Sequence, residues 1–206
     1  MKTISFLSHK GGTGKSTLAI HLAVAAQAEG QEVLLVDLDH HSASVAEWAS
    51  ARTDEKPLVV TAQFSDVTAL HQQATDEGFD LLILDCPPYI NSKTLQASEI
   101  ADITLLPVAP RFTEISGLPK DLGLVSQPFF VVLNSCTSGA EEVREMLNEI
   151  DIPVSPVCFK RLDAFTEALD YGQGVTEYEK NGEAAGQIKK LLDYYVQDPK
   201  NPVNSL

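Results

Sequence analysis

The sequence predicts an α/β protein: a single-domain P-loop fold with a mostly parallel, doubly wound sheet flanked by helices. Short apolar runs, typical of strands covered on both faces, alternate with longer segments of helical periodicity. A glycine-rich segment follows the first apolar run and leads straight into an amphipathic segment. The 206 residues, 44% of them hydrophobic, suit one domain with a sizeable core, which we place at 1–197 with a loose tail at 198–206.

The glycine-rich segment, SHKGGTGKST at residues 8–17, connects an apolar run at 4–7 to a helical segment at 18–26. Its glycines let successive backbone N–H groups point at an anion, and the helix that begins near Lys15 adds its positive N-terminal end. Lys15 is then placed to reach the β- and γ-phosphates of a nucleotide, and Ser16 to ligate a bridging Mg²⁺. The alternative, a glycine-rich turn with unrelated lysines, leaves the flanking strand and helix unexplained. The residues predicted around the phosphates are Lys10, Gly11, Gly12, Thr13, Gly14, Lys15, Ser16 and Thr17.

Two carboxylates follow the apolar run at 33–36. Asp37 and Asp39 fall at the carboxyl end of this predicted strand, which is where open α/β sheets bind ligands. The alternative is that both acids are solvated and cap the helix predicted at 42–51. His40 and His41 come next, and we interpret them as loop residues, because two adjacent imidazoles do not point one way on a strand or tight turn. His21, in the first predicted helix, has no second ligand at i+4 and is interpreted as a packing or surface residue.

A third carboxylate ends the apolar run at 79–84. Asp85 is followed by Cys-Pro-Pro, a stiff turn, and we expect Asp85 to bind Mg²⁺ directly or through water. Asn134 ends a further predicted strand at 129–134, where asparagine also caps turns for local reasons. The other strands are predicted at 58–61, 103–108 and, as a short edge strand, 152–157, and the other helices at 66–77, 141–150 and 184–195.

Charge and cysteine content bound the possible partners. The net charge of −14 opposes diffuse attraction to nucleic acid or anionic lipid, so any such binding requires a local basic patch. Cys86, Cys136 and Cys158 are widely separated and form no C-x-x-C motif, which predicts buried free thiols. No apolar run is long enough to span a bilayer, and we expect a soluble, cytosolic protein.

The phosphate loop departs from the common G-x-x-x-x-G-K-[ST] pattern, because His9 stands where the first glycine would be. Residues 10–16 instead resemble the deviant Walker A box of the ParA/MinD (Soj-like) family of dimerising ATPases, and Asp37, Asp39 and Asp85 follow in the order found in that family. The resemblance implies that Lys10 reaches the partner's nucleotide across a dimer interface and that Asp39 orients or activates the attacking water. It further implies that Asp37 helps to hold the Mg²⁺ shell and that Asn134 hydrogen-bonds the adenine edge. The implied catalytic residues are Lys10, Lys15 and Asp39, and the implied metal site is Ser16, Asp37 and Asp85.

The same resemblance implies a function. Short ParA-type members bind ATP and Mg²⁺, form a homodimer around two nucleotides, associate with nucleoid DNA without sequence preference, and are released when a ParB-like partner stimulates hydrolysis. The cargo is a plasmid, a chromosome region or a protein assembly. The basic residues expected to contact DNA are Lys160, Arg161, Lys189 and Lys190, with simple solvation of an acidic surface as the alternative.

Other functions on this scaffold are weighed against these residues. Lys10 and the lack of clustered cysteines argue against a metabolic or metallocentre-maturation ATPase, and the polar, proline-containing C-terminus argues against a membrane-bound MinD-like switch. The presence of Asp39 argues against a module that holds nucleotide without turnover.

Overall fold

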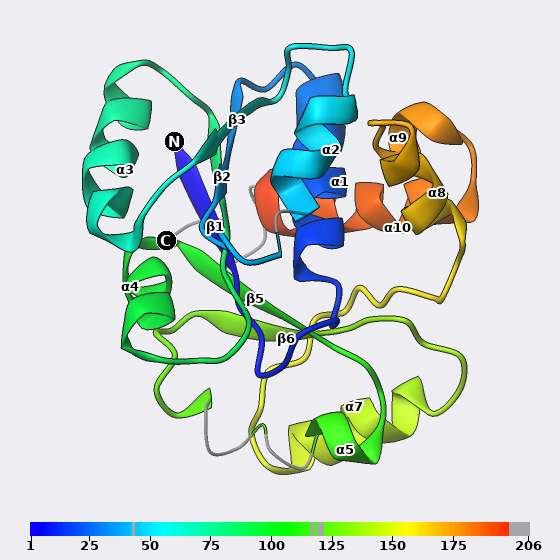
Figure 1. Ribbon diagram of the computed structural model, residues 1–206. Helices are drawn as coiled ribbons and strands as arrows, with labels where there is room; N and C mark the ends of the chain where they lie inside the picture. Colours follow the sequence, from blue (N-terminus) through cyan, green and yellow to red (C-terminus); the bar gives the residue numbers. More distant parts are fainter. Residues whose placement is uncertain (43, 116–117, 119–121, 198–206) are drawn as a thin grey trace.

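The computed structural model describes residues 1–42, 44–115, 118 and 122–197, and a sheet of six parallel strands lies at its centre (Figure 1). The strand order is β3-β2-β4-β1-β5-β6, so the chain starts inside the sheet and builds first one half and then the other. This arrangement confirms the predicted doubly wound α/β fold. The strands are β1 Lys2–Phe6, β2 Val33–Asp37, β3 Leu58–Thr61, β4 Leu81–Asp85, β5 Ile103–Val108 and β6 Phe129–Leu133.

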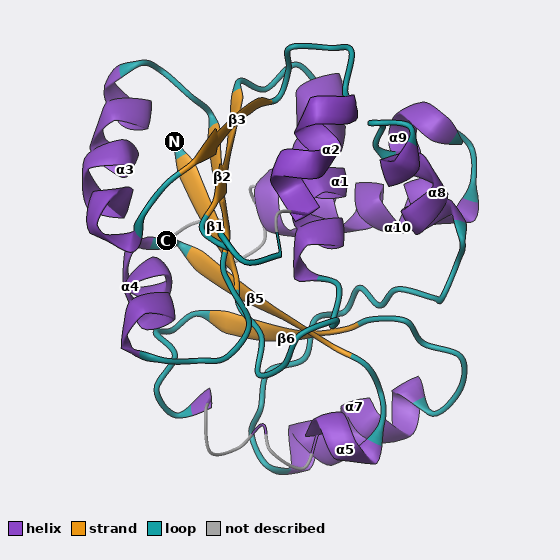
Figure 2. Ribbon diagram, in the orientation of Figure 1, coloured by secondary structure: helices purple, strands orange, loops and turns teal. Residues whose placement is uncertain are grey.

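Helices cover both faces of this sheet (Figure 2). One face carries α1 Lys15–Ala28, α2 Ser44–Ala51, α8 Ala164–Asp170, α9 Val175–Tyr178 and α10 Glu183–Leu192, with the π-helical turn η2 Asp193–Gln197 after it. The other face carries α3 Val67–Asp76, which follows the 3₁₀ turn η1 Phe64–Asp66, together with α4 Ser92–Ile100 and α7 Ala140–Glu149. The short helix α5 Phe112–Ile115 follows the carboxyl end of β5.

Alternation along the buried strands separates two apolar cores. In β2, Val33 and Leu35 belong to the core under α1, whereas Leu34 and Val36 belong to the core under α3 and α4. This is the period of two that a strand imposes on its side chains. Because both faces are covered, the strand reads as a continuous apolar run in the sequence.

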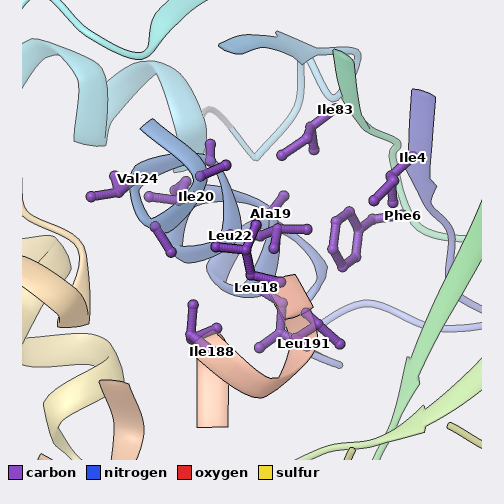
Figure 3. Packing of buried hydrophobic residues seen from close by; sticks show 14 of the residues in the cluster. Ile4, Phe6, Leu18, Ala19, Ile20, Leu22, Val24, Ile83, Ile188 and Leu191 are labelled. Carbon is purple, nitrogen blue, oxygen red and sulfur yellow. The ribbon is translucent and has the colours of Figure 1, made fainter. Parts of the chain in front are cut away.

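The first helix, α1, is enclosed by its neighbours. Residues 18–26 are all buried, because α10 packs over the side of α1 that the sheet leaves uncovered. Figure 3 shows Ile188 and Leu191 of α10 beside Leu18 and Leu22 of α1. The segment that follows the phosphate loop is therefore fixed on all sides, which gives the loop a rigid base.

The prediction of an edge strand at 152–157 is wrong. Val154 forms an isolated bridge to Val131, and only two main-chain hydrogen bonds, at Pro153 and Ser155, join this segment to β6. Proline has no N–H to donate, and Pro153 and Pro156 interrupt the ladder. Elsewhere, Cys86 and Cys136 are buried free thiols and Cys158 is a partly buried one. Among the described residues, no helix combines the length and apolar character needed to cross a membrane.

Candidate nucleotide-binding site

The glycine-rich loop joins β1 to α1 and lines a cavity of about 260 Å³. Gly12 and Gly14 have φ angles of 75° and 94°, which L side chains rarely adopt, so glycine is required at both positions. Because α1 begins at Lys15, the N–H groups that lack partners at a helix N-terminus lie at this cavity. Seven of the predicted site residues line it: Gly11, Gly12, Gly14, Lys15, Ser16, Thr17 and Asp39.

The side chain of Asn134, the residue that follows β6, holds the loop through the main chain of Thr13. The Asn134 side-chain amide donates a hydrogen bond to the carbonyl of Thr13 over 2.7 Å, and Asn134 is 9% exposed. A Cβ on Gly14 would lie 2.2 Å from the same amide nitrogen. The structure thus places Asn134 against the phosphate loop, and its contact with adenine stays a prediction.

Two of the predicted metal ligands end neighbouring strands. Asp37 of β2 is the register partner of Asp85 of β4, and both carboxylates are buried. Burial raises the pKa of Asp85 to about 7, although the Ser16 hydroxyl and the Lys15 ammonium act to lower it. Burial also raises the pKa of Asp37, whose Oδ1 accepts the N–H of Asp39 over 2.9 Å. Both carboxylates therefore favour a nearby cation.

The arrangement fits Mg²⁺. Both carboxylate oxygens of Asp85 are buried, and neither forms a hydrogen bond of normal distance and angle among the described residues, although the Ser16 hydroxyl lies close enough to lower the pKa of Asp85. Oxygen atoms are the ligands that Mg²⁺ prefers, and it is usually held by one or two protein groups together with substrate phosphates and water. Within the described part of the chain, no cluster of three or more His, Cys, Asp or Glu side chains could hold a metal alone. The Ser16 hydroxyl and Asp85 are thus suited to a Mg²⁺ whose remaining ligands come from a nucleotide.

Asp39 lies at the wall of the cavity and is 4% exposed. Its Oδ1 accepts the main-chain N–H groups of His41 and Ser42, over 3.1 and 3.3 Å, which fixes the turn after β2. The carboxylate is therefore buried at the phosphate site, in contrast to the solvated cap that was the alternative. His40 bonds the Ala62 carbonyl through Nε2 over 3.0 Å, and both histidines lie in a turn, as predicted.

Lys10 contacts α5 instead of the phosphate cavity. Its ammonium donates to the carbonyl of Thr113 and lies 3.8 Å from Oε1 of Glu114. Because this contact is made within one chain, the Lys10 side chain must leave it before it can reach the nucleotide of a second copy. Its predicted role across an interface is not tested by this arrangement.

The four cations predicted to contact DNA do not form one cluster. Arg161 lines a second cavity, of about 300 Å³, on whose wall Gly11, Gly12 and Thr13 also lie. Lys160 and Lys190 line a separate groove beside α10, where Lys160 pairs with Glu183 over 2.6 Å. Lys189 lies on α10, half-buried.

Sequence reasoning missed several residues at these cavities. Pro88, Leu169 and Ser44 line the phosphate cavity, while Arg111 and Glu114 line the second one. Each comes from a segment far from the loop in sequence, and no local pattern signals that such residues meet. Pro88 alone had a signal, since it stands in the Cys-Pro-Pro turn after Asp85.

Three features together define a P-loop nucleotide-binding protein. They are the parallel sheet, the glycine loop at a helix N-terminus, and the buried acids at the ends of the neighbouring strands. Residues 4–175 match the family model for the CobQ/CobB/MinD/ParA nucleotide binding domain. The chain belongs to this family.

Individual relatives agree with this assignment. The chain is 32% identical over 215 residues to the maintenance of carboxysome distribution protein A of Gloeobacter kilaueensis, covering 96% of this chain and 95% of that protein. It is 29% identical over 147 residues to the chromosome-partitioning ATPase Soj of Thermus thermophilus, a match that spans 57% of this chain and 59% of Soj. The fold is shared with the septum site-determining protein MinD of Pyrococcus horikoshii, complexed with Mg-ADP, at a TM-score of 0.73 and 17% identity over 93% of this chain and 94% of MinD.

Proposed function

We propose that this ParA/MinD-family ATPase hydrolyses Mg-ATP at the loop of residues 10–17 and uses the nucleotide to control its own dimerisation while it positions a cargo. The observation that carries the proposal is the meeting of Lys15 and Asp39 at the wall of one cavity, with Asp85 within electrostatic reach of Lys15 and Ser16. All three charged residues are buried. Buried charges are costly unless a ligand or partner compensates them. A triphosphate with its Mg²⁺ compensates all three.

Each residue has a role in this proposal. Lys15 and the loop N–H groups bind the β- and γ-phosphates, and Asp39, held by the turn it caps, orients the attacking water toward the γ-phosphate. Ser16 and Asp85 would hold Mg²⁺, and Asp37 would help to hold the water ligands around it. The metal neutralises charge that develops on the phosphate oxygens.

Dimerisation provides the switch. Lys10 leaves Thr113 and Glu114 and places its charge beside the nucleotide of the second copy, so that two ATP molecules lie between two chains. Hydrolysis removes the γ-phosphate and weakens this contact. A partner protein that accelerates hydrolysis would then determine where in the cell the dimer dissociates. Dissociation at the position of the partner would distribute the cargo, which is a plasmid, a chromosome region or a protein assembly. The names of the relatives, for partitioning and for carboxysome distribution, support this class of task.

Two substitutions separate binding from turnover. Asp39→Ala leaves the loop intact, so the variant should bind ATP and accumulate as a dimer while phosphate release falls to background. Lys10→Ala should bind ATP with near wild-type affinity but remain monomeric. The measurements are phosphate release and the mass in solution with Mg-ATP. A Lys10→Ala variant that dimerises as the wild type does would contradict the role in trans, and an Asp39→Ala variant with full turnover would contradict the role of Asp39.

Nonspecific DNA binding, with nucleoid association as its result in the cell, is the second part of the proposal. Lys160, Lys189 and Lys190 are the proposed contacts, and doubling a weak basic surface in the ATP dimer would make binding depend on ATP. An electrophoretic shift of arbitrary duplex DNA at low salt tests this: a shift with ATP and none without is expected. No shift under either condition would contradict DNA binding and favour a protein scaffold instead.

A further inference from the structure

The chain contains four arginines, and they divide into two pairs. Arg52 is bound by Glu177 and Arg144 by Glu141, both through ion pairs. Arg111 and Arg161 form no ion pair among the described residues, although acids outnumber basic residues by 29 to 15 in this chain. These two unpaired arginines line the same cavity.

This cavity, of about 300 Å³, is built against the phosphate loop. Gly11, Gly12 and Thr13 form one side, and the arginines come from two segments that are 50 positions apart in sequence. Both are fixed by main-chain hydrogen bonds, the N–H of Arg111 to the Ala109 carbonyl and that of Arg161 to the Cys136 carbonyl. The loop is thus flanked by cations that no local structure requires.

Among the described residues, one carboxylate lines this cavity, and it is already engaged. Glu114 also lines it, and its Oε1 lies 3.8 Å from the ammonium of Lys10. Ser135 also lines the cavity and contributes a hydroxyl but no charge. While Lys10 balances Glu114, the two guanidinium charges of Arg111 and Arg161 are in excess at this cavity. When Lys10 leaves Glu114, as in the proposed dimer, the two guanidinium charges still exceed the single carboxylate charge of Glu114.

We infer that Arg111 and Arg161 form a binding site for nucleotide phosphate groups on this second side of the loop, a site that rests on the proposed function and extends it. Guanidinium groups make strong, charge-assisted hydrogen bonds to phosphate. The glycine backbone of the loop allows close approach, because no side chain stands between it and the ligand. The phosphates belong either to the nucleotide in the same chain or to the nucleotide held by a second copy, and the recognising chemistry is the same for both.

The test uses Arg111→Gln and Arg161→Gln, with Lys180→Gln as a control that removes one exposed cation from the turn after α9. ATP affinity is measured at protein concentrations where the chain is monomeric, and dimer formation is then measured at saturating Mg-ATP. Loss of a charge-assisted hydrogen bond should weaken one of these equilibria about tenfold. Weaker ATP binding by the monomer assigns the site to the chain's own nucleotide; unchanged ATP binding with weaker dimerisation assigns it to that of the second copy.

Two other outcomes overturn the inference. Arginine variants that match Lys180→Gln in both measurements would show that the cavity binds no nucleotide phosphate. Variants that match it in both measurements but lose the DNA shift would assign the arginines to DNA instead. Wild-type protein that fails to bind ATP would contradict the proposed function itself, a result distinct from either.

Discussion

Asn134 ties the end of β6 to the phosphate loop through a hydrogen bond of 2.7 Å from its side-chain amide to the carbonyl of Thr13. The same side chain occupies the space that a Cβ on Gly14 would need, with 2.2 Å between them. The loop conformation therefore depends on one asparagine that lies more than 100 positions away in sequence.

Asn134→Ala should separate a structural from a base-binding role. Loss of the hydrogen bond should lower the free energy of unfolding by about 1 kcal/mol. If Asn134 also contacts adenine, the affinity for ATP should fall more than the affinity for inorganic tripolyphosphate, which has no base. Both affinities are measured by isothermal calorimetry, with Asn148→Ala on α7 as control. Equal losses of affinity for ATP and for tripolyphosphate would show that Asn134 only holds the loop and does not contact adenine.

Gly172→Ala should be far more destabilising than Gly78→Ala. Both glycines have positive φ angles, 65° and 82°, so alanine at either position is strained by about 1 kcal/mol. At Gly172 an added Cβ would also lie 2.6 Å from the backbone of Ala51 and Arg52, whereas at Gly78 it meets nothing within 4 Å. Urea denaturation of the two variants measures the difference. Equal losses of stability would show that the close approach of α2 to the turn after α8 is not rigid.

The ion pair between Arg52 and Glu177 explains why α2 lies so close to the turn after α8. Glu177 accepts two hydrogen bonds from the guanidinium, of 2.8 and 2.9 Å, and Arg52 stacks over Trp48 with its Cζ 5.2 Å from the ring centre. Burial acts to raise the pKa of Glu177, but its hydrogen bonds to Arg52 and to the Gly174 N–H outweigh this and lower the pKa. The contact links the end of α2, the helix that follows Asp39, to α9.

The sequence predicted the fold because each of its signals is local. Buried parallel strands show as apolar runs, and the strands at 58–61 and 103–108 have the predicted bounds. The phosphate loop and the acids at the strand ends were likewise predictable, since parallel strands bring their carboxyl ends to one edge. The segment at 152–157 was misassigned because its apolar residues suggested a strand while its two prolines removed the donors a strand needs.

The remaining features depend on tertiary contacts that no local pattern encodes. The partner of Lys10 lies on α5, more than 100 positions along the chain. Arg161 was grouped with its neighbour Lys160, but consecutive residues in an extended segment point to opposite sides, so the two line different cavities. Only the folded chain shows which side faces the loop.

His21 should make the protein less stable in mild acid. Burial lowers the pKa of His21 to about 4, and the ring is held by the Phe165 carbonyl at Nε2 and by the Val175 N–H at Nδ1, an arrangement that requires the neutral form. Between pH 6.5 and 4 the unfolded chain therefore binds the additional proton, and stability falls as the pH falls, by up to about 3 kcal/mol.

The acids Asp37 and Asp85 oppose this trend, because a raised pKa makes the folded chain bind protons first. The measurement is therefore a difference: the free energy of unfolding of the wild type minus that of His21→Gln, from pH 7 to pH 4. The difference should decline as the pH falls. A difference that stays constant would mean that His21 titrates alike in the folded and unfolded chains.

The central claim, that Lys15 faces the phosphates of a bound nucleotide, is tested most directly by thermal unfolding with and without Mg-ATP. At a hundredfold excess over Kd, Mg-ATP should stabilise the wild type by about 2.7 kcal/mol, which raises Tm by roughly 5–10 °C for a chain of this size. Lys15→Ala should lose this shift, whereas the control Lys180→Ala should keep it. A Lys15→Ala variant whose ATP-dependent shift equals that of the wild type would contradict the account.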